Sequence, residues 1–345
     1  MRKVVAFDGR GTISVLEQPI PQPGPGEVLI EVRASMISPG TELGGVVWHR
    51  ENPTAAAPTP FGYQNAGDVI AVGEGVTRWQ IGDQLACMGI GDALHATHSL
   101  IPVNLCVPIP EGVSYDEAAS AHLGATALHA IRRAELQISE FVVVVGLGVV
   151  GQFAAQLARL SGAYVMALDR LSLRLEVARQ CGAHRVVNGA AEDALAAARE
   201  FSRGHGLDCG VLAFGGEGTE VFQQVVGMLK VSPDTHQMGR VVIVGGVSIT
   251  HRFAASLGNV DVRSAARTGP GFLDPDYEHG RDYPPVFVPW TTQRNLEEVL
   301  LLTAAGRLDS RSIITHRFPI DEAPAACELL IQRPEQATGV VLTME

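Results

Sequence analysis

The sequence predicts an α/β protein with two domains: a barrel-like β domain and a doubly wound parallel sheet. The chain has 345 residues, more than a single hydrophobic core usually serves. Residues 1–113 alternate Pro- and Gly-rich turns with short β-branched runs, which is typical of antiparallel strands. From Phe141 onward, unbroken apolar runs alternate with helical stretches, which indicates strands buried on both faces.

Composition excludes several classes of function. With 46% hydrophobic and 18% charged residues, the chain is typical of a compact globular protein. Its net charge of -11 argues against nucleic acid or a membrane surface as a partner, because both require clustered basic residues. We find no run long enough for a signal peptide or a membrane span. The cysteines closest in sequence, Cys87 and Cys106, are 19 residues apart, so we do not expect a disulfide framework. A cytoplasmic location is expected instead.

A connector helix is predicted after the β domain. Ser114 and Glu117 have the spacing of a capping box, and the alanine-rich stretch after them predicts a helix to about Ala134. The expected domains are 1–118 with 291–345, and 119–290.

The second half alternates predicted strands and helices. The strand runs are FVVVV at 141–145, YVMAL at 164–168, RVV at 185–187, DCGVLAF at 208–214 and RVVIVG at 240–245. Gly162, Gly182 and Gly306 follow helical segments as stop signals. Residues 268–290 break all periodicity and predict an ordered loop or lid. The tail predicts helices over 295–305 and from 321, with strands near 313–315 and over 340–343.

A dinucleotide site is predicted at the first strand of this sheet. The glycine loop, residues 146–151, consists of Gly146, Leu147, Gly148, Val149, Val150 and Gly151 and leads from a strand into a helix. Such a loop permits a tight turn, a close backbone approach to pyrophosphate, and phosphate binding at the helix N-terminus. Asp169 ends the next strand, 21 residues after Gly148. We assign Gly215 and Gly245, which follow later runs, to the same cofactor site.

Asp169 favours NAD over NADP. Its carboxylate would accept from the ribose hydroxyls and repel a 2′-phosphate, by about 4 kcal/mol per charge pair at ~4 Å and a dielectric constant near 20. Arg170 and Arg174 weaken this preference, since either could turn toward a phosphate. NAD is therefore expected, with NADP as the less favoured alternative.

The order of short blocks along the chain resembles the medium-chain dehydrogenase/reductase superfamily, best known for zinc alcohol dehydrogenases. The blocks are GEVLIEV at 26–32, GTE at 40–42, FGYQNAGDVIAVGEGV at 61–76, GDQL at 82–85, the glycine loop, and ITHRF with its following helix at 314–331. The resemblance implies a GroES-like β-barrel catalytic domain and a Rossmann domain. It also implies an alcohol dehydrogenase or reductase that forms a homodimer or homotetramer, with Thr126 contacting the nicotinamide.

The sequence departs from this pattern at the three positions where the resemblance places zinc ligands. They hold Pro39, Tyr63 and His122, and only the histidine is a usual ligand. A catalytic zinc needs about three protein ligands. The cysteine-rich lobe of zinc members is also absent. We therefore expect a zinc-independent branch of the family.

Tyr63 and His122 are predicted to replace the metal by hydrogen bonding and proton transfer to the carbinol oxygen of a substrate. Thr41 would extend the proton path. His122 is expected to be the better base, because the usual histidine pKa is ~6.5 whereas that of tyrosine is ~10. The alternative is that Tyr63, Gln64 and His122 only fill the vacated metal cavity.

Residues 268–290 carry polar and aromatic side chains that would suit a polyhydroxylated substrate. Substrate contacts are predicted for Glu42, Gln64, Tyr277, Tyr283, Trp290 and Arg294, and the segments SPGTE, DYEHGRDYP and WTTQRN resemble sugar or cyclitol dehydrogenases. Alternatively the loop covers a subunit interface near 260–264. His95 and His98 are not expected to form a ligand pair, since residues three apart in an extended segment face opposite sides.

Three other activities stay open. An enoyl or quinone reductase is common among zinc-lacking relatives, although Asp169 counts against its usual NADPH. A redox-neutral lyase or epimerase would keep NAD tightly bound. A dinucleotide-sensing or crystallin-like binding protein would hold NAD without turnover.

Overall fold

The computed structural model describes residues 1–251 and 254–344, which divide into two compact units. The first comprises Met1–Ala125 and Thr268–Glu345, and the second Thr126–Arg267. The boundary after the Rossmann unit therefore lies before residues 268–290, and the expected division, which placed this loop with the cofactor domain, needs correction. The loop belongs to the first unit because its side chains bond to strands and turns of that unit, as described below.

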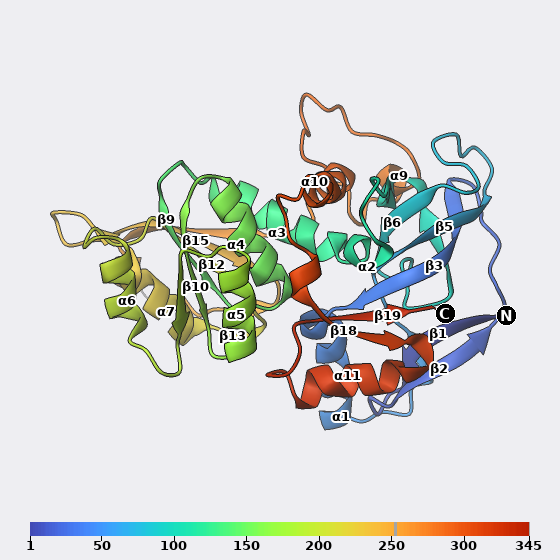
Figure 1. Cartoon of the computed structure of the whole chain (residues 1–345), viewed down its shortest axis with the longest axis horizontal. Helices are drawn as coiled ribbons and strands as arrows, with labels where there is room; N and C mark the ends of the chain where they lie inside the picture. The colour runs from blue at the N-terminus through green and yellow to red at the C-terminus, as the bar shows by residue number, and fades with distance from the viewer. Residues whose placement is uncertain (252–253, 345) are drawn as a thin grey trace. The chain divides into compact units, whose positions relative to one another are not determined.

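Two sheets, mostly antiparallel, form the first unit (Figure 1). The smaller has the order β2-β1-β4 and consists of β1 (Arg2–Phe7), β2 (Ile13–Gln18) and β4 (Thr59–Pro60). The larger has the order β18-β19-β3-β5-β6-β8, and β7 also pairs with β3. Its strands are β3 (Glu27–Ile37), β5 (Gln64–Val72), β6 (Gln84–Met88), β7 (His98–Pro102), β8 (Cys106–Pro108), β18 (Ile314–Pro319) and β19 (Gly339–Thr343). The C-terminal strands thus complete a sheet begun near the N-terminus.

Helices of the first unit are short apart from two near the C-terminus. They are the π-helix η1 (Pro39–Leu43), α1 (Gly44–Glu51), η2 (Val103–Leu105), α2 (Tyr115–Ala118), α9 (Pro275–Glu278), α10 (Thr292–Ala304), η3 (Arg311–Ile313), η4 (Ile320–Glu322) and α11 (Ala323–Gln332). α11 supplies Cys327 and Leu330 to a core shared with Ile37 and Leu342. The helices predicted from 295 and 321 are confirmed, and 268–290 is a loop containing the single turn α9.

The predicted connector helix is interrupted. Ser114 and Glu117 form the expected capping box at α2, but α3 (Ala121–Ala134) begins only after a break at residues 119–120. The hydroxyl of Ser120 donates to the carbonyl of Glu117 at 2.6 Å. The backbone N–H of Ser120 donates to the same carbonyl at 3.1 Å, so the chain makes a tighter turn at the break than an α-helix would.

A parallel sheet forms the second unit, in the order β11-β10-β9-β12-β15-β14 with β17 beside β15. Only β14 is antiparallel. The strands are β9 (Phe141–Val145), β10 (Tyr164–Asp169), β11 (Arg185–Asn188), β12 (Cys209–Leu212), β14 (Lys230–Val231), β15 (Gln237–Val244) and β17 (Asn259–Ala265), and β13 (Gly216–Glu217) pairs with β16 (Val247–Ser248). The helices are α4 (Val149–Leu160), α5 (Ser172–Gln180), α6 (Ala194–Phe201), α7 (Thr219–Met228) and α8 (Ala254–Leu257). The predicted doubly wound sheet is confirmed.

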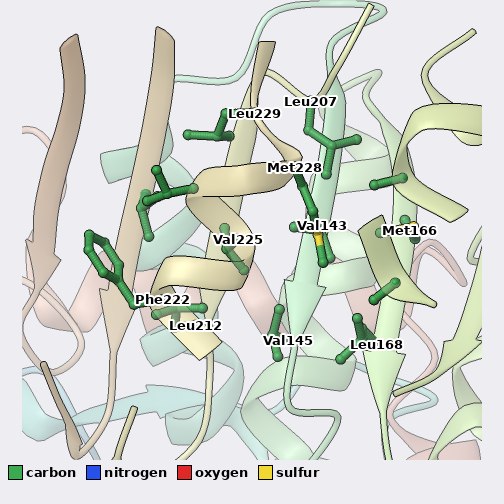
Figure 2. Packing of buried hydrophobic residues seen from close by; sticks show 14 of the residues in the cluster. Val143, Val145, Met166, Leu168, Leu207, Leu212, Phe222, Val225, Met228 and Leu229 are labelled. Atoms are coloured by element: carbon green, nitrogen blue, oxygen red, sulfur yellow. The ribbon is translucent and has the colours of Figure 1, made fainter. Parts of the chain in front are cut away.

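One hydrophobic cluster joins this sheet to α7 (Figure 2). Phe222, Val225 and Met228 recur at helical spacing on α7, and all are buried. They belong to the same cluster as Val143 and Val145 of β9. Because helices cover the strands, the strand side chains that face them must be apolar, which explains the unbroken runs in the sequence.

The strand order reverses between β9 and β12. The chain passes from β9 through β10 to β11 on one side, and the later strands β12 and β15 extend the sheet on the other. In such sheets the crevice outside the carboxyl ends of the two strands at the reversal is the usual ligand site. Among the described residues, no helix is long and apolar enough to cross a membrane.

Candidate functional site

The glycine loop leaves β9 at this reversal and enters α4. Gly146 has φ of 85°, a left-handed conformation that other residues rarely adopt. A Cβ on Gly151 would lie 1.8 Å from the Gly146 carbonyl oxygen, so only glycine allows the loop to close on the helix. Around Gly148, by contrast, a Cβ would meet nothing within 4 Å. The loop is therefore tight at both ends and open in the middle.

Helix α4 begins at Val149 with Gly148 as its N-cap and no side-chain cap. The first N–H groups of a helix have no acceptor within the helix, and the positive end of its dipole attracts anions. Behind the loop, buried Gln152 donates to the Leu147 carbonyl at 3.1 Å and to the Arg174 carbonyl at 2.7 Å. Open space at an uncapped helix start is what a pyrophosphate requires, so the residues present fit a dinucleotide.

Asp169 binds backbone amides at the end of β10. Its carboxylate accepts from the N–H groups of Leu147 at 2.6 Å, Arg170 at 2.6 Å and Leu171 at 2.9 Å. One guanidinium nitrogen of Arg174 lies 3.9 Å from the carboxylate, whereas Arg170 is exposed. Asp169 therefore ties the glycine loop to the next turn of the sheet, a role that the sequence analysis did not foresee.

Gly215 and Gly245 follow β12 and β15 at the same edge of the sheet. A Cβ on Gly215 would meet nothing within 4 Å, and Gly245 has φ of 81°. A Cβ on Gly146 would lie 2.9 Å from both the Ala213 carbonyl oxygen and the Phe214 Cβ, so the chain after β12 runs directly against the glycine loop. These glycines thus lie at the same edge of the sheet as the glycine loop.

In the first unit, Tyr63 lies just before β5 and is 7% exposed. The side chains of Ser38 and Thr41 lie near its hydroxyl and act to lower its pKa. Burial raises the pKa of Tyr63, and the negative charge of Glu42 raises it further. Tyr63 is therefore a neutral phenol at neutral pH. Ser38 was not predicted, since a lone serine before a proline gives no sequence signal.

Ser38 and Thr41 are positioned by the turn η1. Ser38 is buried, whereas Thr41 is exposed, so the three hydroxyl groups lead from a buried ring to an accessible residue. π-Helical turns are rare and often occur at functional sites. The arrangement provides a short hydroxyl path out of the interior of the unit.

His122, at the start of α3, packs against Tyr63. The ring centroids are 4.7 Å apart, and the ring of Phe272 lies 5.6 Å from that of His122 on another side. Burial lowers the pKa of His122 to about 3. The expectation of a base with a near-neutral pKa is therefore wrong, because the apolar surroundings disfavour the imidazolium. A neutral imidazole still has one donor and one acceptor.

Glu42 and His95 form a buried pair behind this turn. Nε2 of His95 lies 3.0 Å from Oε2 of Glu42, and the backbone N–H of Ser38 donates to the same oxygen at 2.7 Å. Nδ1 of His95 contacts the hydroxyl of Ser35. His95 is completely buried, whereas His98 is only partly buried. The sequence analysis gave His95 no role of its own, because its partner Glu42 lies 53 residues away in the chain.

Gln64 is completely buried in β5, and its amide donates to the Met36 carbonyl at 3.0 Å. It therefore braces β5 against β3. Its Oε1 atom is buried and accepts no hydrogen bond from the residues described.

The three positions where zinc ligands were expected do not form a metal site. Pro39 has no ligating atom, Tyr63 is held as a neutral phenol, and His122 is one imidazole. Within residues 1–251 and 254–344, no group of three or more His, Cys, Asp and Glu side chains is placed to hold a metal ion. These residues do not fit the three-ligand set of a catalytic zinc.

The polar side chains of residues 268–290 mostly bond within the first unit. Buried Asn104 donates to the Tyr277 carbonyl at 2.7 Å and to Asp282 at 2.9 Å. Arg78 donates to Asn104 at 2.6 Å and to Asp282 at 2.9 Å. Glu278 accepts from the Leu273 N–H at 2.7 Å. These bonds anchor the loop to the first unit.

Among the predicted substrate residues of this region, Tyr277 needs correction. The Tyr277 side chain is buried, with its ring 4.8 Å from that of Tyr283, whose hydroxyl donates to Asp274. The Arg294 guanidinium lies 4.0 Å above the Trp290 ring and donates to the Pro289 carbonyl. Tyr277 is a core residue, since it is only 2% exposed. Substrate contact by Tyr283, Trp290 and Arg294 stays a prediction.

A hollow of about 700 Å³ lies between α5 and β11 and includes Arg179 and Arg185. Both arginines form ion pairs, with Glu176 and Glu192 respectively. None of the predicted catalytic or cofactor residues lines it. The predicted catalytic and cofactor residues therefore lie outside this hollow.

Comparisons with known proteins agree with this architecture. Residues 24–111 match the alcohol dehydrogenase GroES-like domain, and residues 149–272 match the zinc-binding dehydrogenase family. The Escherichia coli uncharacterized zinc-type alcohol dehydrogenase-like protein YphC is 26% identical, with 93% of each chain covered. The L-threonine 3-dehydrogenase of Symbiobacterium thermophilum is also 26% identical, over 96% of this chain and 93% of its own.

A solved structure gives the same result across both units. The crystal structure of AibC is 25% identical, covers 99% of each chain and has a TM-score of 0.76. The two family matches include Tyr63 in the β domain and the part of the glycine loop from Val149 onward. From the fold, the glycine loop and these relatives, we conclude that the chain belongs to the medium-chain dehydrogenase/reductase superfamily of alcohol dehydrogenase-like oxidoreductases.

Proposed function

We propose that the protein is a zinc-independent, NAD-dependent dehydrogenase that oxidises a secondary alcohol of the polyol, sugar or cyclitol type. The observation that supports this most is the replacement at position 63. A buried phenol near two hydroxyl groups, those of Ser38 and Thr41, takes the position that the family resemblance gives to a metal ligand. Bound NAD would supply the hydride acceptor.

Tyr63 would bind the carbinol oxygen and move its proton. Because burial raises the pKa of Tyr63, a free phenolate is too costly to serve as an intermediate. Tyr63 can avoid that state by passing its own proton to Thr41 while it takes the proton of the carbinol. Thr41 is exposed, so the proton can leave to solvent. Neutral His122 would orient the Tyr63 ring and exclude water from one side.

The glycine loop would bind the cofactor, and Asp169 favours NAD. Its carboxylate is held at the end of β10 by three backbone donors, next to the place where the ribose of a dinucleotide is expected. A fixed negative charge there repels the 2′-phosphate of NADP, which also counts against an NADPH-dependent enoyl or quinone reductase. Glu42 stays a candidate for contact with a substrate hydroxyl, since one of its carboxylate oxygens, Oε1, is buried and accepts no hydrogen bond from the described part of the chain.

Turnover and metal content test the proposal together. Purified protein is assayed for NAD reduction with a panel of polyols, sugars and cyclitols, before and after treatment with 1,10-phenanthroline, and zinc is measured by elemental analysis. We expect activity on at least one polyol, with less than a twofold effect of the chelator. Stoichiometric zinc that is lost together with activity would overturn the proposal.

Substitutions test the role of the phenol. Tyr63→Phe is expected to lower kcat by 10²-fold or more, the usual contribution of general acid–base catalysis. His122→Asn should lower it less. The matched control is Tyr115→Phe, which removes a hydroxyl that donates to Asp68 at 2.5 Å and is expected to leave turnover within twofold. Wild-type turnover in Tyr63→Phe would rule out the proposed mechanism.

A further inference from the structure

Three buried polar side chains from separate elements meet behind the hydroxyl path. Ser35 comes from β3, His95 from the segment before β7, and Glu42 from η1. Ser35 and His95 are completely buried, and Glu42 is 7% exposed. Burying three polar groups together is unfavourable unless they are well paired, so the cluster needs a reason.

The contacts hold His95 in one orientation. Its Nδ1 contacts the Ser35 hydroxyl, which also lies 3.0 Å from the Gln64 carbonyl. Its Nε2 faces Oε2 of Glu42 at 3.0 Å. Both ring nitrogens therefore have a buried polar partner, whichever nitrogen carries the proton.

Glu42 in turn fixes the turn that holds the hydroxyl groups. Its Oε2 accepts from the Ser38 N–H at 2.7 Å, and its own N–H donates to the Ser38 carbonyl at 3.1 Å. Ser38 and Thr41, the two residues near the Tyr63 hydroxyl, lie within the segment closed by these bonds. A shift of Glu42 would therefore move both hydroxyl groups relative to Tyr63.

We infer that Glu42 and His95, with Ser35 behind them, are positioning residues that hold the Ser38 and Thr41 hydroxyl groups against Tyr63. This inference rests on the proposed function, because it assigns the pair a role in the proton path of that site. The charge of Glu42 raises the pKa of Tyr63 and that of Cys327, which is buried in α11. In this positioning role Glu42 acts on the reaction through Tyr63 and its two hydroxyl partners.

A double-mutant cycle separates positioning from a general structural role. Glu42→Gln keeps the size of the side chain but replaces the carboxylate by an amide, and we expect kcat to fall at least tenfold, with KM for NAD unchanged within twofold. If Glu42 acts through Tyr63, then Glu42→Gln should change kcat less than twofold in the Tyr63→Phe background. The control is Glu51→Gln, at an exposed residue of α1, which should not change kcat in either background.

His95→Gln provides a second variant in case Glu42→Gln does not fold. Its amide can replace Nε2 but cannot also reach Ser35, so we expect a smaller loss of kcat that again disappears in the Tyr63→Phe background. Multiplicative losses in the cycle, or a wild-type kcat in both single variants while Tyr63→Phe is impaired, would overturn the inference. A wild-type kcat in Tyr63→Phe itself would instead refute the proposed function.

Discussion

The rings of Tyr63 and His122 lie with centroids 4.7 Å apart and planes tilted by 43°. Both residues are 7% exposed, and burial shifts their pKa values in opposite directions, raising that of Tyr63 and lowering that of His122 to about 3. Both are therefore neutral at neutral pH. The proton path proposed above therefore forms no charged residue at Tyr63 or His122.

Because of His122, the stability of the protein should decrease as the pH is lowered below 6.5. Its pKa is about 3 in the folded chain and about 6.5 when unfolded, so the unfolded state binds more protons between these values. The stabilisation is complete above pH 6.5 and decreases as the pH falls toward 3. At pH 4.5 the loss is on the order of 3 kcal/mol.

Urea unfolding at pH 7 and pH 4.5 measures this loss. In His122→Gln the difference between the two pH values should shrink by that amount, whereas His205→Gln, at an exposed residue, should keep the wild-type difference. An unchanged difference in His122→Gln would show that the imidazole is not held neutral by burial.

Replacement of glycine by alanine should have different effects at two positions of the glycine loop. Gly148→Ala should fold normally, since its Cβ meets nothing within 4 Å and its φ of -65° suits alanine, but should raise the Kd for NAD at least tenfold by filling the phosphate space. Gly151→Ala should destabilise the second unit, because its Cβ would lie 1.8 Å from the Gly146 oxygen. Calorimetric titration with NAD and thermal unfolding distinguish the two. Wild-type affinity in Gly148→Ala would contradict a dinucleotide at this loop.

Asp169 should control the choice of cofactor. Asp169→Asn keeps one oxygen for the backbone donors but removes the negative charge, and we expect the ratio of kcat/KM for NAD to that for NADP to fall at least tenfold. The steady-state rates with each cofactor give this ratio directly. Glu176→Gln, at an exposed position on the following helix α5, is the matched control and should leave it unchanged.

Asn104 should hold the loop of residues 268–290 in place. Asn104→Ala removes the bonds to the Tyr277 carbonyl and to Asp282 and leaves buried groups without partners, at a cost of about 2 kcal/mol. Hydrogen exchange over 274–283 should accelerate, and the unfolding midpoint should drop. Arg281→Ala breaks only the pair with Asp276, in which Arg281 is 80% exposed, and should change stability by less than about 0.5 kcal/mol.

The elements that depend on local patterns were predictable. The capping box at Ser114, the turn at Gly146 and the parallel strands follow from spacing and conformational preference, which act within a few residues. The break before α3, where the N–H and the hydroxyl of Ser120 both donate to the Glu117 carbonyl, was not. The role of His95 was missed because its partners, Ser35 and Glu42, are more than 50 residues away in the chain.

The sequence by itself determined the two-domain architecture, the dinucleotide loop and the loss of the usual metal-ligand types at Pro39 and Tyr63, because these depend on residue type and spacing. Only the tertiary structure decided that Tyr277 is a core residue, that His122 is neutral and that Glu42 pairs with His95. The physical reason is that burial and hydrogen-bond partners are properties of the folded environment. The same imidazole that is half protonated near pH 6.5 in water stays neutral once apolar rings surround it.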